Sequence, residues 1–277
     1  MAKLQVTYMS LALLRTVTLQ VILPVDKFSM AGGMPEEHAP YKTLYLLHGV
    51  FGSDQDWITG TRVSRWAAEH DLAVVMPAGE NSFYVDRPVP GSQYASWIGE
   101  ELVEVTRRMF PLSRRREDTF IAGLSMGGYG AVYNGLSHPE TFSCVASFSG
   151  ALHLFDPDAP KTASQLSGLT NDKFGSMDTA AASGRNPAIL LKQLAARHAK
   201  GEAELPRIYL SCGVDDGLIK ANRRFRSLFT EAGYDLTWYE GPGAHEWDFW
   251  DDQIHRLMDW LPLGEASEGL SSGHVNG

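Results

Sequence analysis

The stretch TFIAGLSMGGYGA, residues 119–131, decides how the rest of the chain is interpreted. It begins as an apolar run of strand-forming residues and continues into small residues that are compatible with a helix. Between the two, GLSMG at 123–127 fits G-x-S-x-G, in which the serine lies on a sharp turn from strand to helix. Glycines flank the serine because side chains would clash in so tight a turn. This context predicts Ser125 as a nucleophile, against the alternative of an incidental serine in a glycine-rich turn.

Apolar runs alternate with helical stretches on both sides of this motif. Alternation of this kind is typical of a parallel sheet that helices cover on both faces. The predicted strands of this sheet are 43–49, 72–77, 119–125, 142–150, 207–213 and 235–241. The predicted helices are 62–69, 93–110, 187–197, 219–232 and 246–261. Residues 15–23 alternate β-branched and polar side chains, which predicts a further strand at a sheet edge.

The 277 residues fit a single α/β domain, which we expect to span 1–263. No strand signal occurs between about 156 and 205, where the chain is rich in Ala, Ser, Gly and Asp. A connection of that length within a compact domain usually has a function, so we interpret it as a small helical cap insertion over the site. The small and polar residues 264–277 predict a disordered tail.

A serine hydroxyl is a weak nucleophile that needs a base, and the base needs a third group to orient it. In α/β enzymes with this motif the order along the chain is Ser, then Asp or Glu, then His. Asp215 and Asp216 follow the strand at 207–213, and His245 follows the strand at 235–241. Spacing alone leaves the two aspartates as alternatives. Among the other histidines, His48 and His153 also follow strands and are candidates for the pocket.

Composition excludes several classes of partner. The net charge of −9 and the pI near 5.5 argue against nucleic acid, whose phosphates need clustered basic residues. The basic run at 114–116 is short and is followed at once by acidic residues. Cys144 and Cys212 lie in apolar strands without metal-type spacing, so we expect reduced thiols and no metal or other cofactor. The apolar patch at 9–14 is too short for a membrane span or signal peptide, which predicts a cytoplasmic protein.

Six segments resemble a known family: LYLLHGVFGSDQDW from Leu44, VVMPAGENSFYVD from Val74, FIAGLSMGGYGA from Phe120, SFSGAL from Ser147, CGVDDGL from Cys212 and HEWDFWD from His245. The chain resembles the esterase D and S-formylglutathione hydrolase-like group of α/β-hydrolases. Within it, the chain is most similar to bacterial tributyrin esterases and acetylesterases, which are related to carbohydrate esterase family 1. The resemblance covers most of the chain and implies the α/β-hydrolase fold.

The resemblance also implies roles for particular residues. The family pattern G-x-x-D-x-L matches Gly213, Asp216 and Leu218, and it selects Asp216 over Asp215 as the acid of a Ser125–Asp216–His245 triad. Such enzymes stabilise the negative oxygen of the tetrahedral intermediate with two backbone N–H groups. By similarity these belong to Met126 and Val50, with Phe51 as the alternative to Val50. Side chains predicted to face the substrate are Trp57, Tyr84, Trp97 and His48.

The implied activity is a serine carboxylesterase that hydrolyses short-chain esters, acetyl to butyryl, through an acyl-enzyme, including acetyl groups on sugars. A feruloyl or cinnamoyl esterase and an S-formylglutathione hydrolase are the enzymatic alternatives. An inactive hydrolase that serves as a binding module is the non-enzymatic one, although such modules usually lose part of the triad. The expected partner is a small-molecule ester. Because members of the family often form oligomers, the resemblance also raises a homo-oligomer as an alternative to a monomer.

Overall fold

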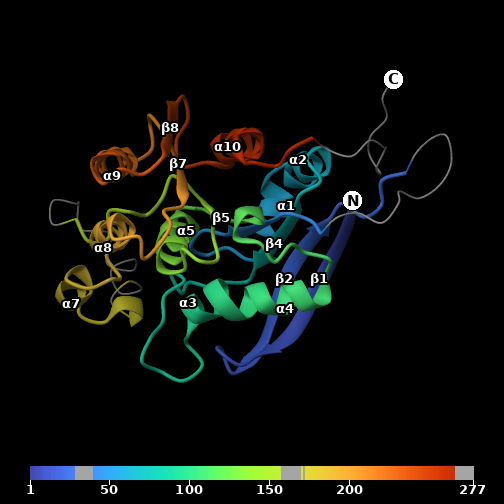
Figure 1. Ribbon diagram of the computed structural model, residues 1–277, viewed down its shortest axis with the longest axis horizontal. Coiled ribbons are helices and arrows are strands. Elements are labelled where there is room, and N and C mark those ends of the chain that lie inside the picture. Colours follow the sequence, from blue (N-terminus) through green and yellow to red (C-terminus); the bar gives the residue numbers. More distant parts are fainter. Residues whose placement is uncertain (29–39, 157–169, 171, 266–277) are drawn as a thin grey trace.

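The computed structural model describes residues 1–28, 40–156, 170 and 172–265. An eight-stranded sheet runs through it in the order β1-β2-β4-β3-β5-β6-β7-β8 (Figure 1). The strands are β1 (Ala2–Ser10), β2 (Arg15–Leu23), β3 (Thr43–Leu47), β4 (Ala73–Pro77), β5 (Thr119–Leu124), β6 (Cys144–Phe148), β7 (Arg207–Gly213) and β8 (Leu236–Gly241). From β4 to β8 neighbouring strands are parallel, while β1 and β2 are antiparallel to each other and β2 to β4. The predicted α/β-hydrolase fold with a mostly parallel sheet is confirmed.

The helices lie on both faces of this sheet (Figure 1). They are α1 (Asp56–Gly60), α2 (Val63–Glu69), α3 (Tyr94–Ser96), α4 (Leu102–Met109), α5 (Met126–Ser137), α7 (Met177–Ala181), α8 (Pro187–Ala199), α9 (Ile219–Glu231) and α10 (Trp247–Trp260), with the short turns η1 (Trp97–Glu101) and η2 (Arg116–Asp118). Side chains of α1, α2 and α10 pack in one apolar cluster on one face. Side chains of α4, α5, α8 and α9 pack in the other.

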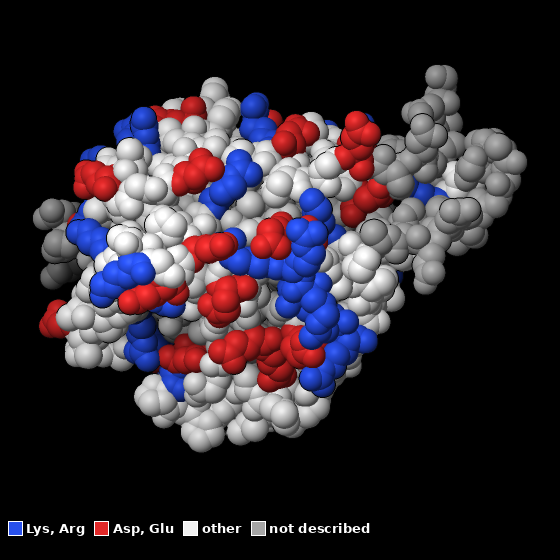
Figure 2. Space-filling view, in the orientation of Figure 1, with Lys and Arg blue, Asp and Glu red and all other residues white. Residues whose placement is uncertain are grey.

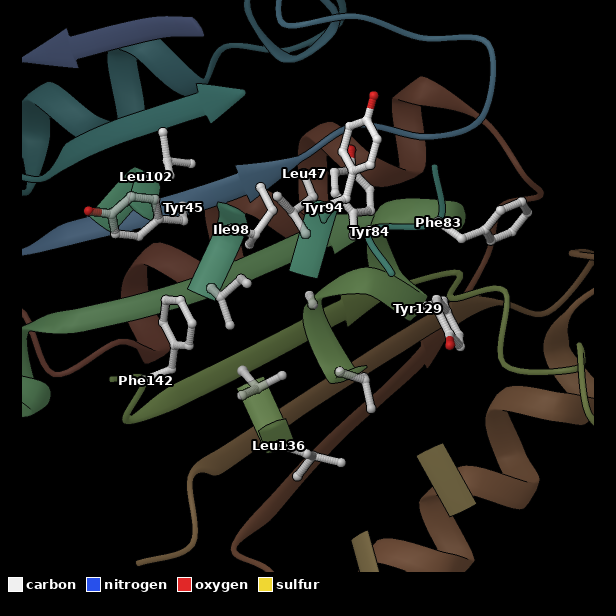
Figure 3. Close-up of a cluster of buried hydrophobic side chains, with 14 of the residues drawn as sticks. Tyr45, Leu47, Phe83, Tyr84, Tyr94, Ile98, Leu102, Tyr129, Leu136 and Phe142 are labelled. Atoms are coloured by element: carbon white, nitrogen blue, oxygen red, sulfur yellow. The ribbon is translucent and has the colours of Figure 1, made fainter. Parts of the chain in front are cut away.

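The two clusters follow from the alternation of side chains along each strand. In β3, Tyr45 and Leu47 belong to one cluster, whereas Leu44 and Leu46 belong to the other. All four are fully buried, as expected for a parallel strand that is covered on both faces. Figure 3 shows the larger cluster, in which Tyr45 and Phe142 meet edge to face with ring centroids 6.0 Å apart. The apolar runs in the sequence are therefore the interior of this sheet.

The N-terminal strand pair differs from the prediction. β1 occupies the sheet edge, so the expectation that Arg15–Leu23 forms an edge strand is wrong. Residues 2–8 alternate apolar half-buried and polar exposed side chains, the pattern of an edge strand with one covered face. β1 pairs with β2 over its whole length, from Ala2 opposite Leu23 to Ser10 opposite Arg15. This hairpin lies far along the sheet from the end of β5, where the serine motif lies (Figure 1).

Only part of the predicted cap lies among the described residues. Within about 156–205 the structure places α7 and α8, while 157–169 and 171 lie outside the described residues, as do 266–277 of the predicted tail. Arg185 ties this region to the domain, because its carbonyl oxygen accepts a hydrogen bond of 2.6 Å from the Tyr129 hydroxyl of α5. Among the described helices, none combines the length and the apolar character needed to cross a bilayer.

Charged side chains of both signs are mixed over the face shown in Figure 2. The basic run at 114–116 is paired with acidic groups: Arg114 with Glu104 at 2.5 Å, Arg115 with Glu117 at 3.4 Å and Arg116 with Glu204 at 3.0 Å. Each of the three positive charges therefore has a nearby carboxylate. The run does not present a patch of uncompensated positive charge.

Candidate active site

Ser125 lies at the sharp turn between β5 and α5. Its backbone has φ 53° and ψ −115°, a conformation that costs free energy for a residue with a side chain. Hydrogen bonds hold the turn in place: the Ser125 N–H donates to the Phe148 carbonyl at 3.0 Å, and the Ser125 carbonyl accepts from Ala151 at 2.9 Å. The neighbouring strand β6 and its following loop therefore fix the serine at the carboxyl end of the sheet.

The predicted base and acid are in contact. His245 lies in the loop between β8 and α10, and its Nδ1 is 2.9 Å from Oδ2 of Asp216. Asp216 follows β7, is 3% exposed, and its Oδ1 accepts a hydrogen bond of 2.8 Å from the Leu218 N–H. Burial tends to raise the pKa of Asp216, but hydrogen bonds from His245, Leu218 and Ser149 outweigh it and hold that pKa below its usual value. Asp216 is therefore a carboxylate at neutral pH, able to orient a histidine.

The alternative acid, Asp215, is exposed to solvent. Its backbone N–H donates to the Gly243 carbonyl at 3.1 Å, which links the two loops that carry Asp216 and His245. The structure thus separates the two aspartates, because only Asp216 contacts the imidazole. Asp215 does not cap the helix that follows either, since Leu218 is the N-cap residue of α9.

The loop after β3 carries the candidate oxyanion donors. The Phe51 N–H donates to Oδ1 of Asn81 at 2.7 Å, so this amide is already occupied. Among the described residues, no hydrogen bond engages the N–H groups of Val50 or Met126. Met126 is the first residue of α5, and the first N–H groups of a helix lack partners within the helix and carry partial positive charge. The geometry therefore favours Val50 and Met126 over Phe51.

Two cavities meet at Ser125. The larger has a volume of about 360 Å³, and its wall is mostly apolar, with Phe83, Ala151 and Leu154 among its residues. The smaller has a volume of about 240 Å³ and includes Asp56, Trp247 and Trp250. Four residues line both cavities: Val50, Phe51, Ser125 and His245. Ser125 and His245 thus lie where the two cavities join, an arrangement that can receive the two sides of an ester.

Comparison with known proteins agrees with this geometry. The family described as "Putative esterase" matches residues 10–261. The chain belongs to this esterase family. An acetyl esterase of Caldicellulosiruptor saccharolyticus is 35% identical over 265 residues, which cover 94% of this chain and 98% of the relative. The family match and this relative identify the chain as a serine carboxylesterase.

Solved structures show the same fold. The S-formylglutathione hydrolase of Staphylococcus aureus superimposes with a TM-score of 0.80 at 28% identity, covering 94% of this esterase and 98% of that chain. A ferulic acid esterase superimposes with a TM-score of 0.73 at 20% identity, covering 94% and 97%. At that identity the second likeness concerns the fold alone.

Four predicted substrate contacts of the esterase lie elsewhere. Trp57, Tyr84, Trp97 and His48 are at most 1% exposed, and none of them lines either cavity. The prediction that these side chains face the substrate is therefore wrong. A buried polar atom needs a hydrogen-bond partner, and the polar atoms of these four side chains have partners in the interior. The Trp97 indole N–H, for example, donates to the Tyr8 hydroxyl at 2.7 Å, far along the sheet from Ser125.

Three of the four make hydrogen bonds to the backbone at the end of β3 and in the loop that carries the predicted oxyanion donor Val50. The Trp57 indole N–H donates to the Leu47 carbonyl at 3.0 Å, and the Tyr84 hydroxyl donates to the His48 carbonyl at 3.0 Å. His48 Nε2 accepts from the Gly79 N–H at 2.9 Å, so the ring carries its proton on Nδ1, which donates to the Gly49 carbonyl at 2.7 Å. Burial lowers the pKa of His48, which keeps the ring neutral. These contacts fix the backbone that leads to Val50.

The sequence reasoning missed most of the cavity wall. The residues that it did not single out include Phe83, Leu154, Thr170, Trp247 and Trp250. Phe83 reaches the cavity from a loop with φ 53°, a backbone conformation that carries no sequence signal in a residue other than glycine. For Trp247 and Trp250 a signal was available, because both lie in the segment HEWDFW that begins with the predicted base His245. His153, named earlier as a pocket candidate, does line the larger cavity.

Gly127 offers a test of how tightly the nucleophile turn is packed. A Cβ at this position would lie 2.6 Å from the His48 carbonyl oxygen and closer still to that of Leu47. Both atoms are backbone and cannot rotate away, so we expect Gly127→Ala to lower the free energy of unfolding by about 3 kcal/mol. Urea denaturation would measure this loss. Gly217→Ala is the matched control, because a Cβ there meets nothing within 4 Å and should cost little. Equal stability of the two variants would contradict the packing argument.

Proposed function

We propose that this esterase hydrolyses short-chain acyl esters, from acetyl to butyryl, with Ser125 as nucleophile, His245 as general base and Asp216 as the orienting acid. The observation that carries the proposal is the 2.9 Å contact between His245 Nδ1 and Asp216 Oδ2 beside Ser125, where the two cavities meet. Ser125, Asp216 and His245 follow β5, β7 and β8, in that order along the chain. This order fits the mechanism of α/β-hydrolases with this motif.

The reaction proceeds in two halves. Ser125 Oγ attacks the ester carbonyl carbon while His245 Nε2 takes its proton, and the resulting oxyanion accepts hydrogen bonds from the N–H groups of Val50 and Met126. When the intermediate collapses, the C–O bond to the alcohol breaks and His245 returns the proton to the leaving oxygen. Water then attacks the acyl-enzyme in the same way and frees the acid. Asp216 holds the proton on Nδ1 throughout and stabilises the charged imidazole.

The short acyl group is supported by two observations. The acetyl esterase relative is 35% identical over nearly the whole chain, which makes acetyl the first candidate. The larger cavity, of about 360 Å³, is at the small end of the range of ligand pockets. Thr170, which belongs to the predicted cap of about 156–205, contributes to the wall of this cavity. We therefore assign the acyl chain to the larger, mostly apolar cavity.

We assign the alcohol part of the ester to the smaller cavity. Its wall combines the Trp247 ring with the Asp56 carboxylate, groups that suit the C–H face and the hydroxyls of a sugar. This supports acetylated sugars as the substrate. We also propose a cytoplasmic location, in which Cys144 and Cys212 stay reduced as the buried free thiols that the structure shows. Self-association stays a prediction that analytical ultracentrifugation would test.

A series of esters tests the substrate class. We expect p-nitrophenyl acetate or butyrate to be cleaved with a kcat/KM at least about tenfold above that of the octanoate, because the larger cavity limits chain length. Methyl ferulate and S-formylglutathione are the comparison substrates. A higher kcat/KM for methyl ferulate would favour a feruloyl esterase, and a higher value for the thioester would favour an S-formylglutathione hydrolase. Cleavage of acetylated xylose, with no cleavage of butyrylated xylose, would place acetyl sugars first.

A further inference from the structure

The ring of Trp250 lies against the catalytic histidine. The centroids of the His245 and Trp250 rings are 4.9 Å apart with an interplanar angle of 89°, an edge-to-face contact. Trp250 belongs to α10 and is 5% exposed, whereas the His245 side chain is 38% exposed and comes from a loop. The Asp216 hydrogen bond restrains one edge of the imidazole, and the indole restrains the ring from another direction. A partly exposed loop residue is thus packed against a buried residue of a helix.

Trp250 is itself anchored by a buried serine. Its indole N–H donates to Oγ of Ser149 at 3.2 Å. Ser149 directly follows β6, is fully buried, and its backbone N–H donates to the Ser211 carbonyl of β7 at 2.8 Å. Its φ is 48°, which is unfavourable for a residue with a side chain and persists only where the surroundings enforce it. Strain of this kind at a buried hydroxyl beside the triad points to a role for the hydroxyl.

The Ser149 hydroxyl connects the indole to the catalytic carboxylate. A hydroxyl that accepts one hydrogen bond still has its own proton to donate. Ser149 is among the hydrogen-bond donors that, against the effect of burial, lower the pKa of Asp216. Asp216 in turn contacts His245. Trp250 thus contacts both Ser149 and His245, and His245 contacts Asp216, so these contacts connect residues from four different segments of the chain.

We propose that Ser149 and Trp250 act as one unit that positions His245 and Asp216 for catalysis, so that the strained serine and the indole are positioning residues rather than core filling. The proposal rests on the proposed roles of His245 and Asp216. Neither residue needs to touch the substrate's reacting atoms for this role. If they only filled the interior, the bond between them would matter for stability and not for the rate of the chemical step.

A double-mutant cycle distinguishes the two roles. Ser149→Ala and Trp250→Phe each break the same hydrogen bond, and phenylalanine keeps an aromatic ring against His245. We expect each variant to lower kcat by about tenfold with KM within about twofold, and the double variant to be no slower than the slower single one, because the two act as a unit. Multiplied effects in the double variant, or a kcat equal to that of the wild type, would overturn the proposal.

Trp260→Phe is the matched control. Trp260 ends the same helix, and its indole N–H donates to the Thr237 hydroxyl at 2.8 Å, a bond of the same type away from the cavities. We expect this variant to lose stability to a similar degree while kcat stays at the wild-type level. If Trp260→Phe slows catalysis as much as Trp250→Phe does, the effect is a general loosening of α10 and the proposal fails.

The pH profile gives a readout that a merely structural role would not move. The titratable groups around His245 and its acid are Asp216, His153 on the loop after β6, and Cys212 of β7. Burial lowers the pKa of His153 and raises the pKa of Cys212, so both stay neutral near pH 7. In Ser149→Ala the Asp216 carboxylate has one hydrogen bond fewer and holds the charged imidazole more strongly. The acid limb of kcat/KM should therefore move to higher pH.

An NMR readout of the His245 ring separates this inference from the proposed function. We expect the Nδ1 proton resonance of His245, which reports the contact with Asp216, to shift in Ser149→Ala relative to the wild type, whether or not the enzyme turns over the chosen ester. Loss of all ester hydrolysis in the wild type would refute the proposed function, while the NMR comparison still tests the contacts of His245. An unchanged resonance in Ser149→Ala would refute the inference and leave the proposed function intact.

Discussion

Ser125→Ala is expected to lower kcat for p-nitrophenyl acetate by at least about 10⁴-fold, because the hydroxyl that forms the acyl-enzyme is gone while the oxyanion donors and the cavities remain. The fold should persist, since alanine keeps the Cβ and the side chain is a small one at 8% exposure. Steady-state rates together with the melting temperature would separate loss of chemistry from loss of structure. Labelling with a fluorophosphonate should also vanish in the variant.

Ser227→Ala is the control for this prediction. Ser227 lies on the exposed surface of α9, where its hydroxyl contacts only the Arg223 carbonyl at 3.4 Å among the described contacts. We expect full activity and full labelling in this variant. Hydrolysis that survives in Ser125→Ala would show that another group attacks the ester. Wild-type protein that is neither labelled nor active would revive the alternative of an inactive binding module.

The sheet could be predicted from the sequence because its strands are buried on both faces. Runs such as TLYLL and AVVMP in β3 and β4 have no polar side that solvent could cover, and parallel pairing is the arrangement that hides both faces. β1 was missed because its sequence, AKLQVTYMS, mixes polar and apolar residues as an edge strand with one covered face does. Overlooking it also placed β2 at the edge, although a hairpin partner covers it.

The three candidate triad residues could be named from the sequence because the chemistry of such a site calls for these residue types in this order, and because each one follows a strand at the same edge of the sheet. The cavity wall could not, since loops with unusual backbone angles decide which side chains reach it. Phe51 illustrates this: its φ of 66° and the bond from its N–H to Asn81 leave its ring 76% exposed at both cavities. Trp57, which was expected to face the substrate, is instead buried in the interior.

The choice between the two aspartates gives the second large effect. Asp216→Asn should lower kcat by about 10³- to 10⁴-fold, an effect of the size seen when a triad acid loses its charge. The reason lies in the hydrogen bond from the Leu218 N–H to Oδ1. An asparagine must keep its carbonyl oxygen on that N–H, which turns its NH₂ group toward His245 Nδ1. The imidazole then carries its proton on Nε2 and cannot accept the proton of Ser125.

Asp215→Asn is the matched variant, because it removes the same charge one residue away. Asp215 is exposed, and its backbone rather than its side chain links the loops, so we expect kcat within about twofold of the wild type. Both variants should be measured at saturating p-nitrophenyl acetate, with melting temperatures to exclude unfolding. A large loss in Asp215→Asn with an active Asp216→Asn would reverse the assignment. A large loss in Asp216→Asn alone would show that the rate depends on the carboxylate at the imidazole and not on net charge at this edge of the sheet.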